Sequence, residues 1–293
     1  MPLRWGRLHV DQQEALRKLQ QAELDTLLVV ARFCQDNGIA WFLDSGSALG
    51  ACRHEGFIPW DDDIDIGMLR PDYDRFCELA ERGLPEGFSL HTSRNTHGYA
   101  GLFAKVYKDG TRFETQETRE AGCEQGIFID VFPYDRLPRD KGARKRVISG
   151  AAWAQRLSYL YYAKTITVPH RGGLGMLERL ACRAAHHVVR LAVREQGRLQ
   201  DEFDRVAACT GSELGDECLS LVWPYMKPVS QGTLVPPSTA TFEGHELPVP
   251  CKPEAYLENM YGDWRKIPAP EERHTHLPLL LDFGDGTRWE SAS

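Results

Sequence analysis

The sequence predicts an α+β protein with a mixed β-sheet core flanked by helices, on the strength of two patterns. In the first half of the chain, short apolar stretches with β-type alternation are separated by segments with helical apolar spacing. From residue 140 to about 208 the spacing turns helical, and residues 233–252 return to a β-rich pattern. We therefore expect a mixed α and β core over residues 1–140, a helical subdomain over 141–232, and a C-terminal segment, 233–293, that packs back on the core.

Bulk composition excludes several classes of protein. The 293 residues, 42% of them hydrophobic, are enough to bury a sizeable core, and the net charge of −7 argues against sequence-independent nucleic-acid binding. None of the 8 cysteines forms a CxxC pair, so neither a zinc ribbon nor a disulfide framework is indicated. The sequence has no signal-peptide pattern and no apolar run of about 20 residues, the length of a membrane span. We expect a cytoplasmic protein that meets a membrane, if at all, from its inner surface.

The N-terminal segment predicts a helix, a strand and a Gly-Ser turn. Residues 11–36 have helical leucine spacing, with Asp11 as N-cap and Gly38 as the C-terminal stop. Residues 39–43 read as a short buried strand, and Gly46-Ser47 as a turn before a short helix. Small residues at such a turn let backbone N–H groups face a ligand, although most Gly-Ser pairs are ordinary turns.

Four carboxylates fall within the next five-residue stretch, at Asp61, Asp62, Asp63 and Asp65. Carboxylates this close repel one another and raise each other's pKa values, so a cluster of this kind usually holds a cation. The alternation from Asp63 to Ile66 places Asp63 and Asp65 on one face of a strand and the isoleucines in the core. Asp61 shares that face if the extended backbone starts early, whereas Asp62 points away.

Two later strands each carry a charged residue inside an apolar run. Lys105 lies in the stretch 101–107, where it either snorkels from a strand edge or binds a phosphate. Asp130 lies in the middle of 126–134, where an unpaired carboxylate costs several kcal/mol. It is either held by a salt bridge or cap, or it is a third metal ligand facing Asp63 and Asp65.

Arginine and lysine are frequent in the predicted helical region, from Lys141 to Arg198. A charge run of this kind is most often a solvated helix face, but it also suits an anionic acceptor or lipid head groups.

The acidic stretch admits four interpretations. An EF-hand loop starting at Asp61 fails, because Gly67 is its seventh residue instead of its sixth and Asp72 stands in place of the final Glu. A solvated acidic loop does not explain the interleaved isoleucines. The Asp-x-Asp of a sugar-nucleotide glycosyltransferase leaves the upstream Gly-Ser turn and Asp130 unexplained.

The fourth interpretation, a nucleotidyltransferase-type site, uses all of these features. Such a site has a Gly-Ser turn, then Asp-x-Asp on a strand, then a third carboxylate on a neighbouring strand. Two Mg²⁺ ions about 4 Å apart can then clamp the attacking and leaving oxygens of a phosphoryl displacement.

Three segments resemble the motifs of the LicD family, which includes bacterial phosphocholine transferases and is related to the fukutin-type ribitol-phosphate transferases. The first runs from Gly46 to Gly67, the second from Gly126 to Pro133, and the third from Tyr256 to Trp264, where Tyr or Phe is more usual at the last position. The resemblance covers residues from about 20 to 275. It implies a nucleotidyltransferase-like core and transfer of a phospho-alcohol, most simply phosphocholine, from a CDP-activated donor to a glycan or glycolipid hydroxyl, with release of CMP.

The resemblance also assigns roles to residues. Metal binding, by Mg²⁺ or alternatively Mn²⁺, is expected of Asp61, Asp63, Asp65 and Asp130, and catalysis of the last three. Candidates for the donor are Gly46, Ser47, Arg53 and Lys105. Four aromatic residues are either core residues or a cation–π cage for choline: Trp60, Tyr134, Tyr261 and Trp264. The alternatives are transfer of ribitol- or glycerol-phosphate, transfer of a sugar from a nucleotide donor, and a catalytically silent glycan-binding scaffold.

Overall fold

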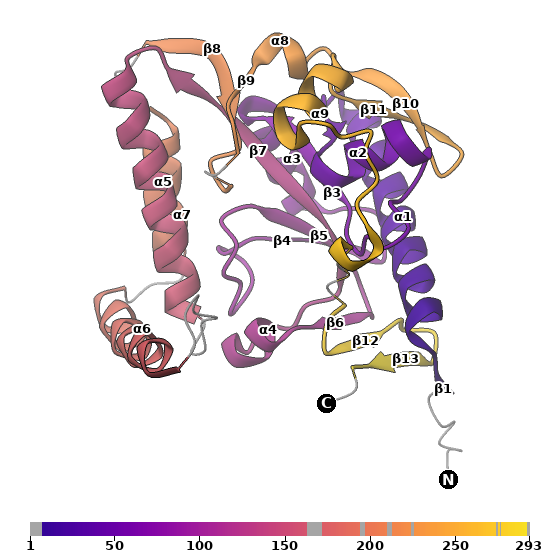
Figure 1. The fold of residues 1–293 in the computed structure, drawn as a ribbon, viewed down its shortest axis with the longest axis horizontal. Helices are drawn as coiled ribbons and strands as arrows, with labels where there is room; N and C mark the ends of the chain where they lie inside the picture. The colour runs from indigo at the N-terminus through magenta and orange to yellow at the C-terminus, as the bar shows by residue number, and fades with distance from the viewer. Residues whose placement is uncertain are drawn as a thin grey trace.

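A mixed β-sheet forms the centre of the molecule, as predicted (Figure 1). The computed structural model describes residues 8–162, 172–193, 197–209, 213–223, 226–273, 275 and 277–291. The central strands run in the order β2-β3-β7-β5-β4, with β8 and β9 continuing from the far half of β7. Their bounds are Phe42–Leu43 (β2), Asp65–Leu69 (β3), Phe88–His91 (β4), Ala104–Lys108 (β5), Ile127–Pro138 (β7), Leu214–Leu219 (β8) and Val229–Ser230 (β9).

The long strand β7 connects the parts of this sheet. Its first half pairs parallel with β3 and antiparallel with β5, and its last residues pair antiparallel with β8. Because β8 falls at 214–219, the range expected to be the helical subdomain also contributes strands to the core sheet. Ile64, Ile66 and Ile129 are fully buried, in keeping with the predicted alternation.

Three helices flank the N-terminal half of the sheet: α1 (Gln12–Asn37), α2 (Ser45–His54) and α3 (Arg70–Arg82). Asp11 caps α1 by accepting a hydrogen bond from Glu14 N at 2.7 Å, and Gly38 ends it in the left-handed conformation, both as predicted. The predicted Gly46-Ser47 turn is instead the first turn of α2. The helix starts earlier because Asp44, which directly follows β2, serves as its N-cap.

The helical region consists of α5 (Lys141–Tyr162), α6 (Gly172–Ala192) and α7 (Arg198–Ala207). Helices α5 and α7 lie side by side, and α6 lies across one end of α5, away from the sheet (Figure 1). His186 on α6 is buried, and its Nδ1 lies 2.8 Å from the carbonyl oxygen of Leu160. One face of α6 is thereby fixed to α5.

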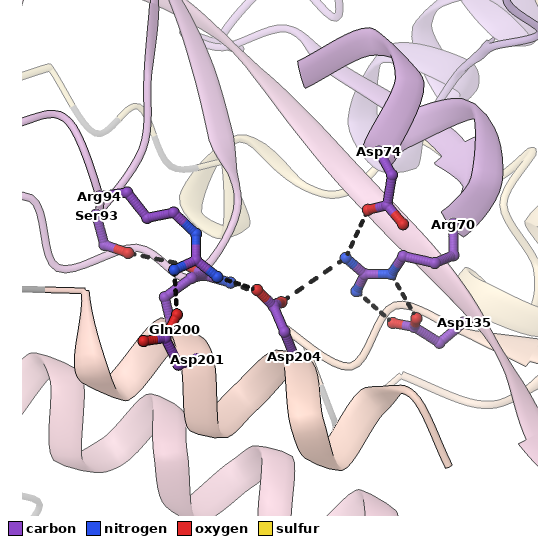
Figure 2. A network of polar contacts seen from close by, with 8 residues as sticks. All are labelled: Arg70, Asp74, Ser93, Arg94, Asp135, Gln200, Asp201 and Asp204. Atoms are coloured by element: carbon purple, nitrogen blue, oxygen red, sulfur yellow. Dashed lines mark hydrogen bonds and ion pairs between the residues drawn. The ribbon is translucent and has the colours of Figure 1, made fainter. Parts of the chain in front are cut away.

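An ion-pair network ties α7 to the core (Figure 2). Arg70, at the start of α3, makes a bidentate contact with the buried carboxylate of Asp135, with distances of 2.7 and 2.9 Å. It also reaches Asp204 of α7 at 3.9 Å, and Asp204 accepts a 2.7 Å hydrogen bond from Arg94. The network therefore links α3, β7 and the loop after β4 to a helix about 100 residues further along the chain.

The C-terminal segment contacts the core at two places. Helix α9 packs against α2, and β12 extends β6 in a small second sheet of order β1-β13-β12-β6. The remaining elements are β1 (Leu8–His9), β6 (Arg112–Glu114), α4 (Gln116–Ala121), α8 (Gln231–Leu234), β10 (Ser238–Phe242), β11 (His245–Val249), α9 (Pro253–Tyr261), η1 (Pro270–Glu272), β12 (Leu280–Asp282) and β13 (Thr287–Glu290). Within the described residues, no helix is both long and apolar enough to cross a bilayer.

Candidate active site

A row of charged residues crosses the central sheet at one level. Asp65 on β3 is the register partner of Asp130 on β7, and Asp130 is in turn the partner of Lys105 on β5. Residues paired in this way project from the same face of a sheet. The sheet register thus places the second half of the Asp-x-Asp beside the third predicted carboxylate.

These carboxylates line one cavity of 380 Å³, here called the acidic cavity. Asp63, Asp65 and Asp130 contribute to its wall together with Ser45, whose φ of 45° is in the left-handed region that costs a non-glycine residue energy. The rest of the wall consists of Phe132, Trp223, Met226, Lys227, Asn259 and Met260.

Burial and mutual repulsion make the carboxylates hard to ionise. Burial, followed by the charges of Asp63 and Asp62, raises the pKa of Asp61 to about 8. Burial and the neighbouring charges of Asp63 and Asp130 hold the pKa of Asp65 well above its usual range. Burial also raises the pKa of Asp130, but the ion pair with Lys105 opposes this, and the value is about 6. The ionised form of these carboxyl groups is therefore unfavourable in the protein alone, and a bound cation would stabilise it.

The predicted Gly-Ser pair supports the carboxylates from behind. A Cβ atom at Gly46 would lie 2.9 Å from Oδ2 of Asp61, so glycine lets that carboxylate approach the backbone of α2. Ser47 is buried, and its hydroxyl accepts a hydrogen bond of 2.9 Å from Asp65 N. Neither residue lines the acidic cavity, whose wall contains the neighbouring Ser45.

The two predicted donor-binding cations have protein partners. Lys105 Nζ lies 2.7 Å from Asp130 Oδ1, with both side chains largely buried. Arg53 donates to the carbonyl oxygen of Trp264 at 2.8 Å and so holds the C-terminal segment against α2. Arg53 lines neither this cavity nor the second one described below, although its charge lowers the pKa of Asp61.

The four aromatic residues predicted to form a cation–π cage for choline do not line the acidic cavity, nor do they line the second cavity described below. Tyr134 is buried, and its hydroxyl donates to Asp44 Oδ1 at 2.8 Å. The rings of Trp60 and Trp264 already stack against guanidinium groups of the chain, those of Arg273 and Arg265, at 4.5 and 4.3 Å. The fourth ring, Tyr261, is 43% exposed.

Two buried carboxyl groups beside the site were not recognised from the sequence. Asp44 is fully buried between the hydroxyls of Tyr134 and Tyr256, and its Oδ2 has no hydrogen-bond partner among the described residues. Glu23 on α1 is also fully buried, with both oxygens unpartnered in the described structure. A signal for Glu23 exists in the sequence, since it lies four residues from both Leu19 and Leu27 on the apolar face of α1.

Lys227 and Asn259 were missed as well. They reach the acidic cavity from the segment before β9 and from α9, about 100 and 130 residues after Asp130. No local pattern marks either residue, so only the tertiary structure reveals them. Together they add one cation and one amide to the wall of the acidic cavity, and the Asn259 amide also donates to the carbonyl oxygens of Lys227 and Pro228 at 3.3 and 3.4 Å.

The chemistry of the donor set fits a hard divalent cation. The acidic cavity offers carboxylate oxygens, and Lys105 compensates only part of their charge. Among the described residues, no three acidic, His or Cys side chains lie close enough together to hold a metal ion without other ligands. Mg²⁺ does not need one, because it usually binds one or two carboxylates and completes its shell with water and substrate phosphates.

Comparison with known proteins agrees with this geometry. A family model described as LicD/FKTN/FKRP, nucleotidyltransferase domain, matches residues 38–169. The lipopolysaccharide cholinephosphotransferase LicD of Haemophilus influenzae is 35% identical over 126 residues, which are 43% of this chain and 46% of that protein. The mouse ribitol 5-phosphate transferase FKRP is 31% identical over 103 residues, 29% of this chain and 21% of its own length. The chain thus matches less than half the length of either relative.

The matched residues contain the first two motifs, Gly46 to Gly67 and Gly126 to Pro133, and three of the carboxylates that the sheet brings to one cavity. The resemblance found in the sequence is therefore confirmed. Residues 38–169 of the chain are similar to the nucleotidyltransferase domain of the LicD/FKTN/FKRP proteins.

Proposed function

We propose that this chain transfers a phospho-alcohol, most simply phosphocholine, from a CDP-activated donor to a hydroxyl of a cell-surface glycan or its lipid-linked precursor, releasing CMP. The observation that carries the proposal is the convergence of Asp63, Asp65 and Asp130 on one cavity, within the stretch matched by the nucleotidyltransferase model. The cholinephosphotransferase activity in the name of the H. influenzae relative supports choline as the first alcohol to test.

The proposed reaction is a single phosphoryl displacement. The acceptor hydroxyl oxygen bonds to the phosphorus that carries the alcohol, and the bond from that phosphorus to the bridging oxygen breaks. CMP leaves with the bridging oxygen. Asp130 takes the hydroxyl proton. We assign Lys227, which also lines the acidic cavity, to the donor's phosphates, with Asn259 beside it.

Asp63, Asp65 and Asp130 would hold Mg²⁺, or Mn²⁺ in its place, with Asp61 as a further carboxyl group next to them in the chain. The bound ion supplies positive charge to the phosphoryl oxygens. Gly46 and Ser47 act as positioning residues: the first admits the carboxylate of Asp61, and the second fixes the backbone of Asp65.

The test is CMP release from CDP-choline in the presence of Mg²⁺ and a glycan or glycolipid acceptor. We expect Asp63→Asn and Asp65→Asn each to lower kcat at least about 100-fold, because charge stabilisation in phosphoryl transfer is worth several kcal/mol. The exposed Asp36→Asn, which only removes a surface ion pair with Arg32, is the matched control. Wild-type turnover in both active-site variants would disprove the assignment.

A donor panel separates the alternatives. Release of CMP from CDP-ribitol or CDP-glycerol, but not from CDP-choline, would favour the activity in the name of the FKRP relative. Turnover of a nucleotide sugar alone would indicate a glycosyltransferase. A catalytically silent scaffold would show no turnover and, in a titration, no Mn²⁺ binding in the presence of donor nucleotide.

We further propose that the chain meets its acceptor on an anionic membrane surface through helix α6. Four apolar residues on one face of this helix are between 52% and 77% exposed: Met176, Leu180, Val188 and Leu191. The exposed Arg183 and Arg190 border that face, and His186 fixes the opposite face to α5. An exposed apolar stripe with arginines along its edge is typical of helices that lie in the interface of a bilayer with anionic lipids.

A further inference from the structure

A second cavity, of 570 Å³, adjoins the acidic cavity and shares Asp130 and Trp223 with it. Besides Trp223, six aromatic residues from the loop between β4 and β5, from β6, β7 and α5 line it, and we call it the aromatic chamber: Tyr99, Phe103, Phe113, Phe128, Tyr159 and Tyr162. No motif in the sequence pointed to this set.

The rings are arranged from buried to exposed. Tyr99, Phe103, Phe113 and Phe128 are 3–7% exposed and form the base of the chamber, whereas Tyr159 is 37% exposed. Trp223, which the two cavities share, is 44% exposed. A ligand can therefore enter past Tyr159 and Trp223 and reach Asp130 while it remains surrounded by rings.

The chamber already holds one cation on an aromatic face. Lys105 Nζ lies 3.2 Å from the centroid of the Phe128 ring and 5.6 Å from that of Phe103, while it pairs with Asp130. This geometry is a cation–π contact, which strengthens where water is excluded. The rings of this wall are thus oriented so that a positive charge is stabilised.

The chamber also has a surplus of negative charge. Glu117 on α4 lines it and forms no ion pair within the described residues, so Asp130 and Glu117 face the single charge of Lys105. A neutral ligand leaves this surplus uncompensated, whereas a cationic ligand offsets it.

Several hydroxyl groups of the chamber are already hydrogen-bonded within the protein. The Tyr99 hydroxyl already donates to the carbonyl oxygen of Phe103 at 3.1 Å, and the hydroxyls of Thr115 and Thr118 are used in the capping box that starts α4. Each ribitol hydroxyl buried without a partner would cost free energy, while methyl groups on nitrogen need none.

We infer that the aromatic chamber binds the head group of the transferred alcohol and that this head group is a quaternary ammonium. The inference rests on the proposed function and deepens it, because Asp130 joins the chamber to the phosphoryl site and a phosphorus-linked alcohol could extend from one into the other. It also relocates the cation–π site from the four aromatics suggested by the sequence to a different set of rings.

The experiment titrates choline alone, without nucleotide or metal, and follows binding by calorimetry or by saturation-transfer NMR of its methyl signal. We expect Tyr159→Leu to weaken choline binding about three- to ten-fold, the effect of losing one cation–π contact. Tyr159→Phe keeps the ring and should stay within about two-fold of the wild type. Trp153→Leu, on the same helix but outside the chamber, is the matched control and should not change binding.

The neutral carbon isostere of choline, with a quaternary carbon in place of nitrogen, should bind about ten-fold more weakly than choline. Equal binding of choline and the isostere, or equal binding of choline by Tyr159→Leu and the wild type, would overturn the inference. Choline binding without CMP release from any CDP-alcohol would support the aromatic chamber as a choline site and disprove the proposed transferase activity. CMP release from CDP-ribitol with no binding of choline would disprove choline binding in the aromatic chamber, while transferase activity would still be supported.

Discussion

At the scale of single residues, Glu23 is expected to govern part of the pH dependence of stability. Burial, and then the charges of Asp63, Asp62, Asp61 and Asp130, hold its pKa well above 4.5. The folded state therefore keeps a proton that the unfolded state releases, so the free energy of unfolding falls as pH rises above about 4.5, by about 1.4 kcal/mol per pH unit for this group. Glu23→Gln removes this titration, and its stability should decline less steeply between pH 5 and 8.

Urea denaturation across that pH range, in buffer without divalent cations, measures the difference. Glu14→Gln, in the exposed first turn of the same helix, is the control and should keep the wild-type slope. If Glu23→Gln lost stability with pH as steeply as the wild type, the carboxyl of Glu23 would be ionised in the folded protein.

At the scale of elements, the contact between α3 and β7 should be a main source of stability. Arg70 is the ion-pair partner of Asp135, whose side chain is only 3% exposed. Arg70→Met leaves that carboxylate buried and uncompensated, which typically costs about 3–5 kcal/mol. Arg32→Met breaks a solvent-exposed ion pair on α1 and should cost less than about 1 kcal/mol. Denaturant titration at pH 7 compares the two, and equal losses would contradict a structural role for the network in Figure 2.

The same scale explains what the sequence could and could not predict. The period-2 alternation of Asp63 to Ile66 is local, so it gave the correct face for both aspartates, and the fold class followed from similar patterns. The aromatic chamber depends on how α4 and α5 pack beside β5 and β7, which no local period encodes. Tyr134 illustrates the limit: it follows a recognised motif closely, yet its hydroxyl is used to hold Asp44 inside the core.

At the scale of the whole molecule, the exposed apolar face of helix α6 is distinct from the region that holds the clustered aspartates. The chain carries a net charge of −7, yet the exposed apolar face of α6 is bordered by arginines. Helix α6 itself lies away from the central sheet that carries the aspartates (Figure 1). A protein with this net charge is repelled by anionic lipid unless a local surface overcomes the repulsion. Binding through α6 should therefore require both the apolar residues and the arginines.

Flotation with phosphatidylglycerol-containing vesicles tests this requirement. Leu180→Glu with Leu191→Glu should lower vesicle binding by at least about ten-fold, because each leucine contributes about 1.5–3 kcal/mol when buried in lipid. Arg183→Gln with Arg190→Gln should remove the preference for anionic over phosphatidylcholine vesicles, at about 1 kcal/mol per arginine. Ile267→Glu, a similarly exposed apolar position on the C-terminal segment, is the control. Vesicle binding that all three variants leave intact, or self-association through α6 without vesicle binding, would contradict membrane docking by this helix.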